Sequence, residues 1–256
     1  TMAVAEIKKP SYGLEFVAQT RAGEKILVPF TAVGELWEVK PLKGEVYKPE
    51  KPLRLNETHR RKPPCRYFPK CFNCQWMHLK PEIQTRYKIN LFEEYLGFQP
   101  DEVLTSPSEF SYRVRAFFYH RGGKWGFRKS WIFDPSRPLL EIESCPLLPE
   151  PINQTLSRLR DIKFPDNLWG AELLLNPQRG EVFVKLLFLK RDFNLSTAVA
   201  LARDIPAVGV GIYRGEYRHW ERIQTLGRWE TELTLRGFTY RFSPDCFLQP
   251  NYLLWE

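Results

Sequence analysis

Three of the chain's five cysteines lie within a stretch of ten residues, in the segment PPCRYFPKCFNCQWMHL. Cys65, Cys71 and Cys74 are separated by five and then two residues, and a further cysteine, Cys145, is followed directly by Pro146. Thiolates at such a spacing can converge on one metal ion or cluster, and a distant fourth thiolate can complete the ligand set. The sequence therefore predicts that the chain folds around a metal site with Cys65, Cys71, Cys74 and Cys145 as its ligands.

The ligand type alone leaves two kinds of metal site open. Thiolates suit both zinc and iron–sulfur clusters. Zinc ribbons usually pair one C-x2-C with a second, which this chain lacks, whereas a close trio with a remote Cys-Pro is more typical of a [4Fe–4S] cluster. The spacing thus favours the cluster and keeps zinc as the alternative. His78, four residues after Cys74, is a weaker candidate ligand.

The cysteine count and the first residues indicate the compartment. Five cysteines in 256 residues is a low and odd number, and the opening TMAVAEIKKP lacks the apolar core of a secretory signal. We therefore expect a reducing, cytoplasmic location. No apolar run approaches the roughly 18 residues of a membrane span. We expect no membrane partner, and we expect the protein to act as a monomer.

The pattern of apolar runs predicts a barrel followed by a mixed domain. Residues 12–55 alternate strand-length apolar runs with Gly and Pro, which is typical of a small OB-like barrel, and we place this domain at residues 1–58. The polar segment NETHRRKPP then predicts a linker. Pro81 and Gly97 bracket a predicted helix. The later hairpins and helices indicate an α+β domain over residues 59–240 rather than a doubly wound sheet.

A basic and aromatic hairpin is the clearest candidate for contact with RNA. The net charge of +8 favours a polyanionic partner. Strand-like runs YRVRAFFYH and KWGFRKSWIF flank a glycine turn, and their cations alternate with aromatic residues. Such a surface can stack RNA bases and neutralise phosphates, and the alternative is a half-buried hairpin with a solvated cationic face. The candidate RNA-binding residues are Arg113, Arg115, Arg121, Lys124, Arg128 and Lys129.

A glycine pair in VGVGIYRG looks at first like part of a nucleotide-binding loop. Gly209 and Gly211 form a GxG, but Arg214 occupies the third glycine position and no helix pattern follows. We therefore predict a strand in which these glycines allow close packing of the backbone.

Ordered motifs along the chain resemble the RNA uracil-C5 methyltransferase family. The motifs are VPFTAVGELWEVKPLKGEVYKPEKPLRL, the cysteine segment with QWMHL followed by Gln84 and Lys88, then YRVRA, GFRK, IESCPLLP and FSPDCFLQPN. The resemblance as a whole extends from about Tyr12 to Asn251. This family joins an N-terminal TRAM barrel to an iron–sulfur domain and to a Rossmann-type catalytic domain that binds S-adenosyl-L-methionine (SAM).

The resemblance implies roles for particular residues. It makes the four cysteines ligands of a [4Fe–4S] cluster, and it aligns Gln249 with a glutamine that contacts SAM. The chain departs from the family where Phe72 and Asn73 replace two glycines, and where Leu248 and Pro250 flank Gln249. The implied function is SAM-dependent C5-methylation of a uridine in RNA, with rRNA favoured over tRNA as the partner.

The short C-terminal segment leads to an expectation about activity. Only five residues follow Asn251, whereas a Rossmann-type domain needs on the order of 100. We therefore expect residues 241–256 to begin that domain, the domain itself to be absent from this chain, and the chain alone to be inactive with no catalytic residue. Cys246 is expected to be an incidental thiol. The alternative function is a non-catalytic RNA-binding module with a structural iron–sulfur or zinc site.

Overall fold

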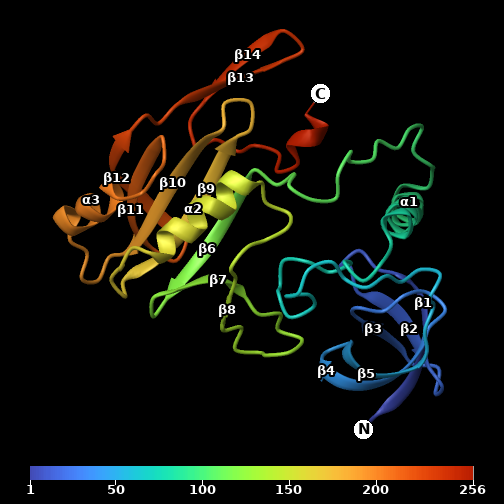
Figure 1. Ribbon diagram of the computed structural model, residues 1–256. Coiled ribbons are helices and arrows are strands. Elements are labelled where there is room, and N and C mark those ends of the chain that lie inside the picture. Colours follow the sequence, from blue (N-terminus) through green and yellow to red (C-terminus); the bar gives the residue numbers. More distant parts are fainter. Residues whose placement is uncertain (256) are drawn as a thin grey trace. The chain divides into compact units, whose positions relative to one another are not determined.

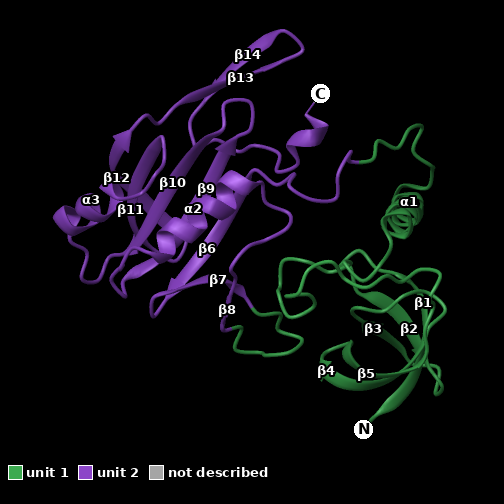
Figure 2. Cartoon of the chain, viewed as in Figure 1, with its two compact units in different colours: residues 1–105, 129–137 green, residues 106–128, 138–256 purple. Residues whose placement is uncertain are grey.

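The computed structural model describes residues 1–255 (Figure 1). These residues form two compact units (Figure 2). Unit 1 comprises residues 1–105 and 129–137, and unit 2 comprises residues 106–128 and 138–256. These boundaries differ from the three domains expected from the sequence, because the cysteine segment and the helix after it cluster with the barrel.

Unit 1 is built on a closed five-stranded barrel with the strand order β1-β2-β3-β5-β4 (Figure 1). It lies where the sequence predicted a small barrel, although its first strand begins earlier. Most neighbouring strands are antiparallel, and a single parallel bridge between β3 and β5 closes the barrel. The strands are β1 (Ala3–Pro10), β2 (Phe16–Thr20), β3 (Lys25–Val28), β4 (Leu36–Lys43) and β5 (Val46–Arg54).

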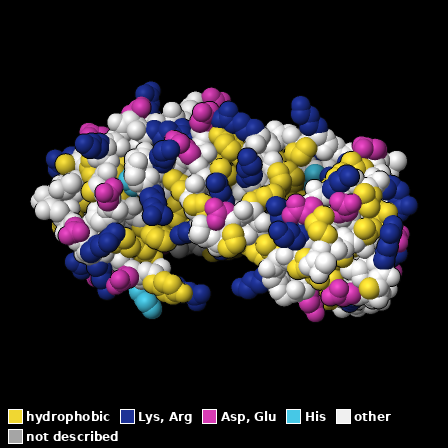
Figure 3. Space-filling model, turned by 90° about the horizontal axis from the view of Figure 1, so that it is seen from below, with side chains coloured by type: hydrophobic (Ala, Val, Ile, Leu, Met, Phe, Trp, Pro, Cys, Tyr) yellow, Lys and Arg dark blue, Asp and Glu magenta, His cyan; other side chains and the backbone are white. Residues whose placement is uncertain are grey.

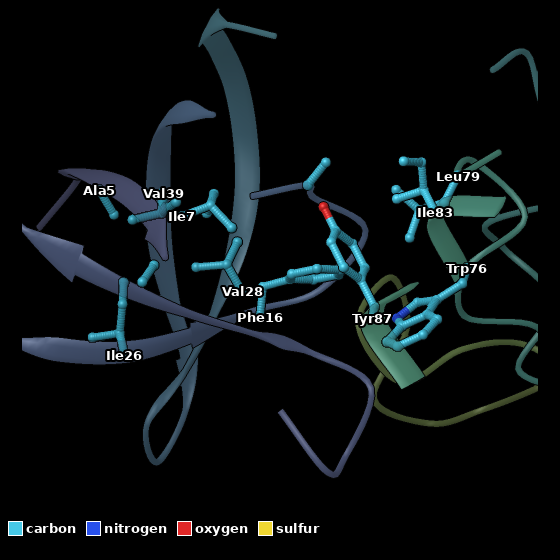
Figure 4. Packing of buried hydrophobic residues seen from close by; sticks show 12 residues of the cluster. Ala5, Ile7, Phe16, Ile26, Val28, Val39, Trp76, Leu79, Ile83 and Tyr87 are labelled. Atoms are coloured by element: carbon cyan, nitrogen blue, oxygen red, sulfur yellow. The ribbon is translucent and has the colours of Figure 1, made fainter. Parts of the chain in front are cut away.

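The barrel core extends into the segment that follows the cysteines. Alternate strand residues such as Ile7, Phe16 and Val28 are buried, as the two-residue period of a strand requires. Trp76 and Tyr87 join the same cluster, and their ring centroids lie 5.9 and 5.6 Å from that of Phe16 (Figure 4). Burial of these aromatic rings is the main reason why the segment packs as part of unit 1.

Helix α1 (Pro81–Leu96) confirms the helix predicted from its terminal residues. Pro81 stands in the first turn, where its missing N–H costs nothing, and Gly97 ends the helix in a left-handed conformation. Ile83 and Tyr87 face the barrel core, whereas Tyr95 in the last turn of the helix is 62% exposed. No helix within residues 1–255 is long and apolar enough to cross a membrane.

Unit 2 contains a seven-stranded sheet with the order β12-β11-β10-β9-β6-β7-β8. All neighbouring pairs are antiparallel except β10 and β11, which are joined through helix α3 as a parallel pair requires. The bounds are β6 (Arg115–Arg121), β7 (Lys124–Arg128), β8 (Leu139–Glu141), α2 (Glu150–Arg160), β9 (Leu168–Asn176), β10 (Glu181–Leu189), α3 (Leu195–Arg203), β11 (Gly209–Glu216) and β12 (His219–Gly227).

The two glycine predictions for this sheet are confirmed. Gly122 and Gly123 join β6 to β7 with φ angles of 56° and 75°, which residues with side chains rarely adopt. Gly209 and Gly211 lie in β11, and a Cβ atom on Gly209 would come within 1.7 Å of the Arg228 carbonyl oxygen. The GxG is therefore a closely packed strand.

The sheet of unit 2 has one covered face and one open face. Phe118, Val184 and Ile212 are fully buried on the covered face, and helix α2 contributes Ile152 and Leu156 to the same core (Figure 1). The next residues along β6 and β10 point the other way and are only half-buried. These half-buried side chains define the open face, which includes Phe117, Tyr119, Glu172 and Lys185.

The C-terminal residues return to the same sheet. The hairpin of β13 (Thr231–Leu235) and β14 (Phe238–Phe242) is followed by a segment whose Pro250 carbonyl accepts the Val114 N–H at 3.0 Å. The Tyr252 N–H then donates to the Tyr112 carbonyl at 3.2 Å, before the 3-10 turn η1 (Tyr252–Leu254). Residues 241–255 therefore pack as part of unit 2.

A buried ion pair joins the barrel to the segment after it. Glu35 is 0% exposed and accepts hydrogen bonds from the backbone N–H groups of Ala32 and Asn56 and from the Trp37 indole. Arg60 donates to both Glu35 carboxylate oxygens, at 2.5 and 2.8 Å. Burial by itself raises the pKa of Glu35, but the Arg60 hydrogen bond and charge, with the other donors, lower this pKa below its ordinary value.

We predict that Glu35→Gln lowers the free energy of unfolding of unit 1 by about 3 kcal/mol, because Arg60 loses its buried counter-charge. Urea unfolding measures the change, with Glu50→Gln on exposed β5 as a control that stays within about 0.5 kcal/mol. Because the Glu35 pKa is lowered on folding, its contribution is complete above the ordinary value of 4.5 and is lost as the pH falls below it. An unchanged acid transition in Glu35→Gln contradicts this role.

Candidate nucleic-acid interface

The open face of the unit 2 sheet carries a row of aromatic rings. Phe117 and Tyr119 of β6 meet edge to face with centroids 4.9 Å apart, and Trp169 of β9 meets Tyr119 at 5.6 Å. Over the surface visible in Figure 3, lysine and arginine side chains are spread among acidic and apolar ones rather than gathered in one block. The aromatic row is the feature that marks the open face.

Glycine makes room for these rings. Gly126 of β7 and Gly170 of β9 are the cross-strand partners of Tyr119 on its two sides. A Cβ atom on Gly170 would lie 2.7 Å from the Phe117 ring, which is closer than carbon atoms can approach without a shift. The absence of a side chain at Gly170 lets the Phe117 ring lie close over the sheet, whereas a Cβ atom on Gly126 would meet the Leu140 carbonyl oxygen at 1.9 Å.

Arg128 of β7 places a cation on the aromatic row. Its guanidinium carbon lies 4.5 Å from the Tyr119 ring centroid and 5.5 Å from that of Trp169. Cation–π attraction at these distances holds the guanidinium over the rings. A cation beside half-buried rings is the arrangement that single-stranded nucleic acid uses, since bases stack on rings and phosphates pair with the cation. Of the predicted RNA-binding residues, Arg128 has the geometry most suited to that role.

Arg115 has a different set of partners. Its Nη2 donates to the carbonyl oxygens of Pro244 at 2.9 Å and Cys246 at 2.6 Å, and its Nη1 lies 3.5 Å from Glu172. Only 19% of the side chain is exposed. Arg115 thus holds the C-terminal segment against the sheet, and we leave it out of the proposed RNA contacts.

The remaining predicted cations lie at the edges of the hairpin or outside unit 2. Arg113 is exposed and donates from Nε to the Arg115 carbonyl at 3.1 Å. Arg121 and Lys124 flank the glycine turn, and Lys124 lies 3.5 Å from Glu141 in an exposed pair. Lys129 belongs to unit 1, where its backbone bridges to Cys71. The sequence patch is therefore divided between two units.

A charged network across the open face was missed by sequence reasoning. Lys185 of β10 lies 3.0 Å from Glu172 and 3.2 Å from Asp245. Asp245 also accepts hydrogen bonds from Tyr213, from Arg222 at 2.6 Å and from the Trp229 indole at 3.0 Å. The one sequence signal was a lysine inside the otherwise apolar strand EVFVKLLFL, which implies a nearby carboxylate.

The network shifts the pKa values of its members. Burial and then the hydrogen bond to Asp245 raise the pKa of Tyr213 well above its ordinary value, so the phenol stays protonated and donates. Burial raises the pKa of Asp245, but the Tyr213 and Trp229 hydrogen bonds and the Lys185 charge lower it below its ordinary value overall. The carboxylate is therefore held ionised, and it anchors the C-terminal segment to the sheet.

Gln249 lies in the segment that this network anchors. Its side chain is exposed, and its backbone carbonyl oxygen accepts the Trp255 indole N–H at 2.9 Å. Asn251 fixes the next turn by donating to Ser106 at 3.1 Å and accepting from the Leu253 N–H at 3.1 Å. One exposed glutamine does not enclose a cofactor, so its predicted contact with SAM stays a prediction.

The four cysteines predicted as metal ligands are divided between the two units. Within residues 1–255, no group of three or more His, Cys, Asp or Glu side chains is placed to hold a metal. Cys65, Cys71 and Cys74 belong to unit 1 and Cys145 to unit 2. His78 is buried, and its Nε2 lies 2.8 Å from the Thr31 carbonyl, a structural contact. The geometry therefore gives the [4Fe–4S] site no support, and the four-cysteine assignment stays a prediction of the spacing.

The comparisons with known proteins agree with one another on the kind of protein. No protein-family model matches the chain. It is 28% identical over 247 residues to an uncharacterised RNA methyltransferase of Aquifex aeolicus, a match that covers 91% of this chain and 57% of that protein. It is 27% identical over 211 residues to the 23S rRNA (uracil(1939)-C(5))-methyltransferase RlmD of Aeromonas salmonicida, covering 76% of this chain and 46% of that protein. The chain thus spans about half the length of the curated relatives it matches.

A solved structure has the same fold. The crystal structure of Pyrococcus abyssi tRNA (uracil-54, C5)-methyltransferase in complex with S-adenosyl-L-homocysteine superposes with a TM-score of 0.73 at 20% identity. The match covers 96% of this chain and 61% of that chain. In sequence and in fold, the chain is therefore similar to RNA methyltransferases.

The match to this solved structure corrects the predicted fold class. We predicted a TRAM-like barrel and an α+β domain with an iron–sulfur site, with no Rossmann-type methyltransferase domain in the chain. A solved structure instead matches 96% of this chain in fold, and this match overturns the predicted fold class. The prediction was wrong because it inferred a missing domain from the few residues after Asn251, and that length does not show which earlier elements a fold uses.

We predict that Asp245→Asn loosens the C-terminal segment, because the amide replaces a charge held by Lys185 and Arg222. Hydrogen–deuterium exchange of a peptide covering residues 243–250 should become faster by about a factor of five, equivalent to about 1 kcal/mol. Asp204→Asn, at the exposed end of α3, is the matched control and should leave that peptide unchanged. Equal exchange in the Asp245→Asn variant and the wild type would refute the anchor.

Metal analysis tests the cysteine spacing independently of the structure. The spacing predicts about four irons per chain after anaerobic purification, and it predicts that Cys71→Ser loses them. Zinc in place of iron would support the alternative metal. A protein free of both metals would show that the cysteines are ordinary thiols.

Proposed function

We propose that this protein is a SAM-dependent RNA (uracil-C5) methyltransferase, and that the open face of unit 2 binds unpaired RNA. The observation that carries the proposal is the sequence similarity to RNA methyltransferases along 91% of the chain. The aromatic row with Arg128 supports it, because this row suits single-stranded RNA. Methylation of a base requires that base to leave its stack, so a surface that holds neighbouring unpaired bases serves the reaction.

The proposed substrate is rRNA rather than tRNA. A relative matched in sequence is named as a 23S rRNA enzyme, whereas the tRNA enzyme is matched by fold at 20% identity. Fold is shared among enzymes with different substrates, so sequence similarity is the better guide to the RNA. The C5 position of uracil is part of the same proposal.

SAM, when bound, supplies the methyl group. The described residues act on the RNA and on the C-terminal segment: Arg128 pairs with phosphate, Tyr119 and Trp169 stack bases, and Asp245 fixes the segment that carries Gln249. We propose Gln249 as a contact of SAM by its alignment with the family. The expectation that the chain alone is inactive rested on the missing domain, and it loses its support with the corrected fold class.

Cys246 is not proposed as the nucleophile. Its thiol is exposed, and its Sγ lies 3.9 Å from the Ser243 hydroxyl. The neighbouring carboxylate of Asp245 is already engaged by Tyr213 and Arg222, so it does not serve as a base for this thiol. The residue remains an incidental thiol in the proposed mechanism.

We predict that Arg128→Ala weakens binding of single-stranded RNA about tenfold and lowers the slope of log K against log salt by about 1, because one phosphate contact is lost. Trp169→Ala should weaken binding by a similar factor without changing the slope, because stacking is uncharged. Fluorescence anisotropy at several salt concentrations measures both. Arg203→Ala, a cation lost from exposed α3, should leave affinity within twofold. Equal losses in all three variants would contradict a specific site.

The activity is tested with the protein produced from its complete reading frame. Incubated with methyl-labelled SAM and 23S rRNA transcript, it should place label in 5-methyluridine after digestion to nucleosides. Label only in tRNA would overturn the rRNA assignment. RNA binding without any transfer would support the non-catalytic RNA-binding module instead.

A further inference from the structure

Unit 1 contains a pocket that the proposed chemistry does not use. Its volume is ≈ 270 Å³, close to the lower end of small-molecule pockets. Three aromatic residues from separate parts of the chain line it, namely Phe30, Phe72 and Trp131. Walls formed by aromatic rings suit a flat ligand, and the volume suits one nucleobase rather than a dinucleotide.

Two backbone positions in the pocket wall are strained. Leu14 and Phe30 have φ angles of 72° and 60°, in the left-handed region that bulky side chains rarely adopt. Each is held by a hydrogen bond to its carbonyl, from the Trp76 indole at 2.8 Å and from Arg60 at 3.0 Å. Such strain costs about 1–3 kcal/mol per residue and clusters at binding sites. The presence of two strained residues in one wall therefore indicates that the shape of the pocket serves binding.

Cations stand beside the aromatic walls. The Arg137 guanidinium carbon lies 4.3 Å from the centroid of the Phe72 ring. Phe133 stacks on Phe30 with centroids 5.9 Å apart, and the Lys48 ammonium lies 5.9 Å from the Phe133 ring. Neither cation lines the pocket itself, and Lys48 also pairs with Glu50 at 3.5 Å, but both stand within reach of a phosphate attached to a bound base.

The wall carries two side-chain acceptors, the Glu15 carboxylate and the Gln75 amide oxygen, beside the Ser130 hydroxyl. Glu15 lines the pocket, and its carboxylate packs against Gly13. A Cβ atom added to Gly13 would lie only 2.4 Å from the Glu15 Oε2 atom. Gln75 donates one of its two amide N–H groups to the Phe72 carbonyl at 3.0 Å, and its amide oxygen can accept a hydrogen bond. Acceptors recognise the exocyclic amino groups of adenine, cytosine and guanine, which uracil lacks.

A metal cluster is a poorer occupant of this pocket. Of the described residues that line it, Cys74 alone is a cysteine. A cluster needs several thiolates around it. The aromatic walls and the neighbouring cations match an organic anion with a flat ring system instead.

We propose that this pocket binds one unpaired nucleobase of the RNA, and that it selects a base with an amino group over uracil. The inference rests on the proposed function, because the RNA that supplies the base is the proposed substrate. The pocket holds a base other than the methylated uridine, so its effect is on the choice and placement of the RNA.

Titration with nucleoside 5′-monophosphates tests the pocket on the whole chain. The tryptophan indole N–H signals in a two-dimensional NMR spectrum should shift saturably with AMP or CMP, at a Kd of about 1 mM or below. UMP should bind about tenfold more weakly. Trp131→Ala should weaken AMP binding about tenfold, whereas Phe98→Ala, an aromatic at the exposed end of α1, should leave it unchanged.

The conservative variant Glu15→Gln provides a second test of the pocket in case Trp131→Ala unfolds the protein. It should reduce the preference for AMP over UMP to less than threefold while the spectrum stays dispersed. Equal binding of AMP and UMP, or binding unaffected by both pocket variants, overturns the inference. If nucleotides do not bind but Arg128→Ala still weakens RNA binding, the pocket fails and the proposed function stands. If AMP binds in the pocket but no RNA binds, the proposed function fails instead.

Discussion

The buried ion pair between Glu35 and Arg60 joins the barrel of unit 1 to the segment that follows it. Glu35 is fully buried, so its charge would be costly without Arg60 and its other donors. Arg60 also donates to the Phe30 carbonyl at 3.0 Å, and so the pair holds one strained residue of the pocket. Because Arg60 follows the barrel, a single buried charge fixes both the barrel end and the segment that leads to the cysteines.

In unit 2, glycine residues and charged side chains together determine the arrangement of the open face of the sheet. Gly170 lets the Phe117 ring lie against the backbone, and Arg128 completes the aromatic row. Further along the same face, Lys185 and Asp245 fix the C-terminal segment. RNA contact and placement of that segment are thus proposed for one surface.

Sequence patterns over a few residues predicted single helices and turns well. They did not predict contacts between residues far apart in the sequence. Pro81 and the glycine turn at Gly122 gave a helix and a hairpin, because the backbone preferences of these residues act over a few positions. Arg115 was assigned to RNA although its partners lie more than 120 residues away at Pro244 and Cys246, and no alternation pattern shows such a partner. The predicted fold class was wrong for a similar reason. It was inferred from the few residues after Asn251, and the length of that segment does not reveal which earlier strands the chain shares with a known fold. The cysteine spacing remains untested by geometry.

The central claim is that unpaired RNA lies on the open face of unit 2. Ultraviolet cross-linking of a uniformly labelled RNA to the whole chain, followed by mass spectrometry of the cross-linked peptides, tests it most directly. The account predicts cross-links at Tyr119 and Trp169, lost together with affinity in Arg128→Ala. Cross-links confined to α2 and α3, or undiminished in that variant, would contradict it.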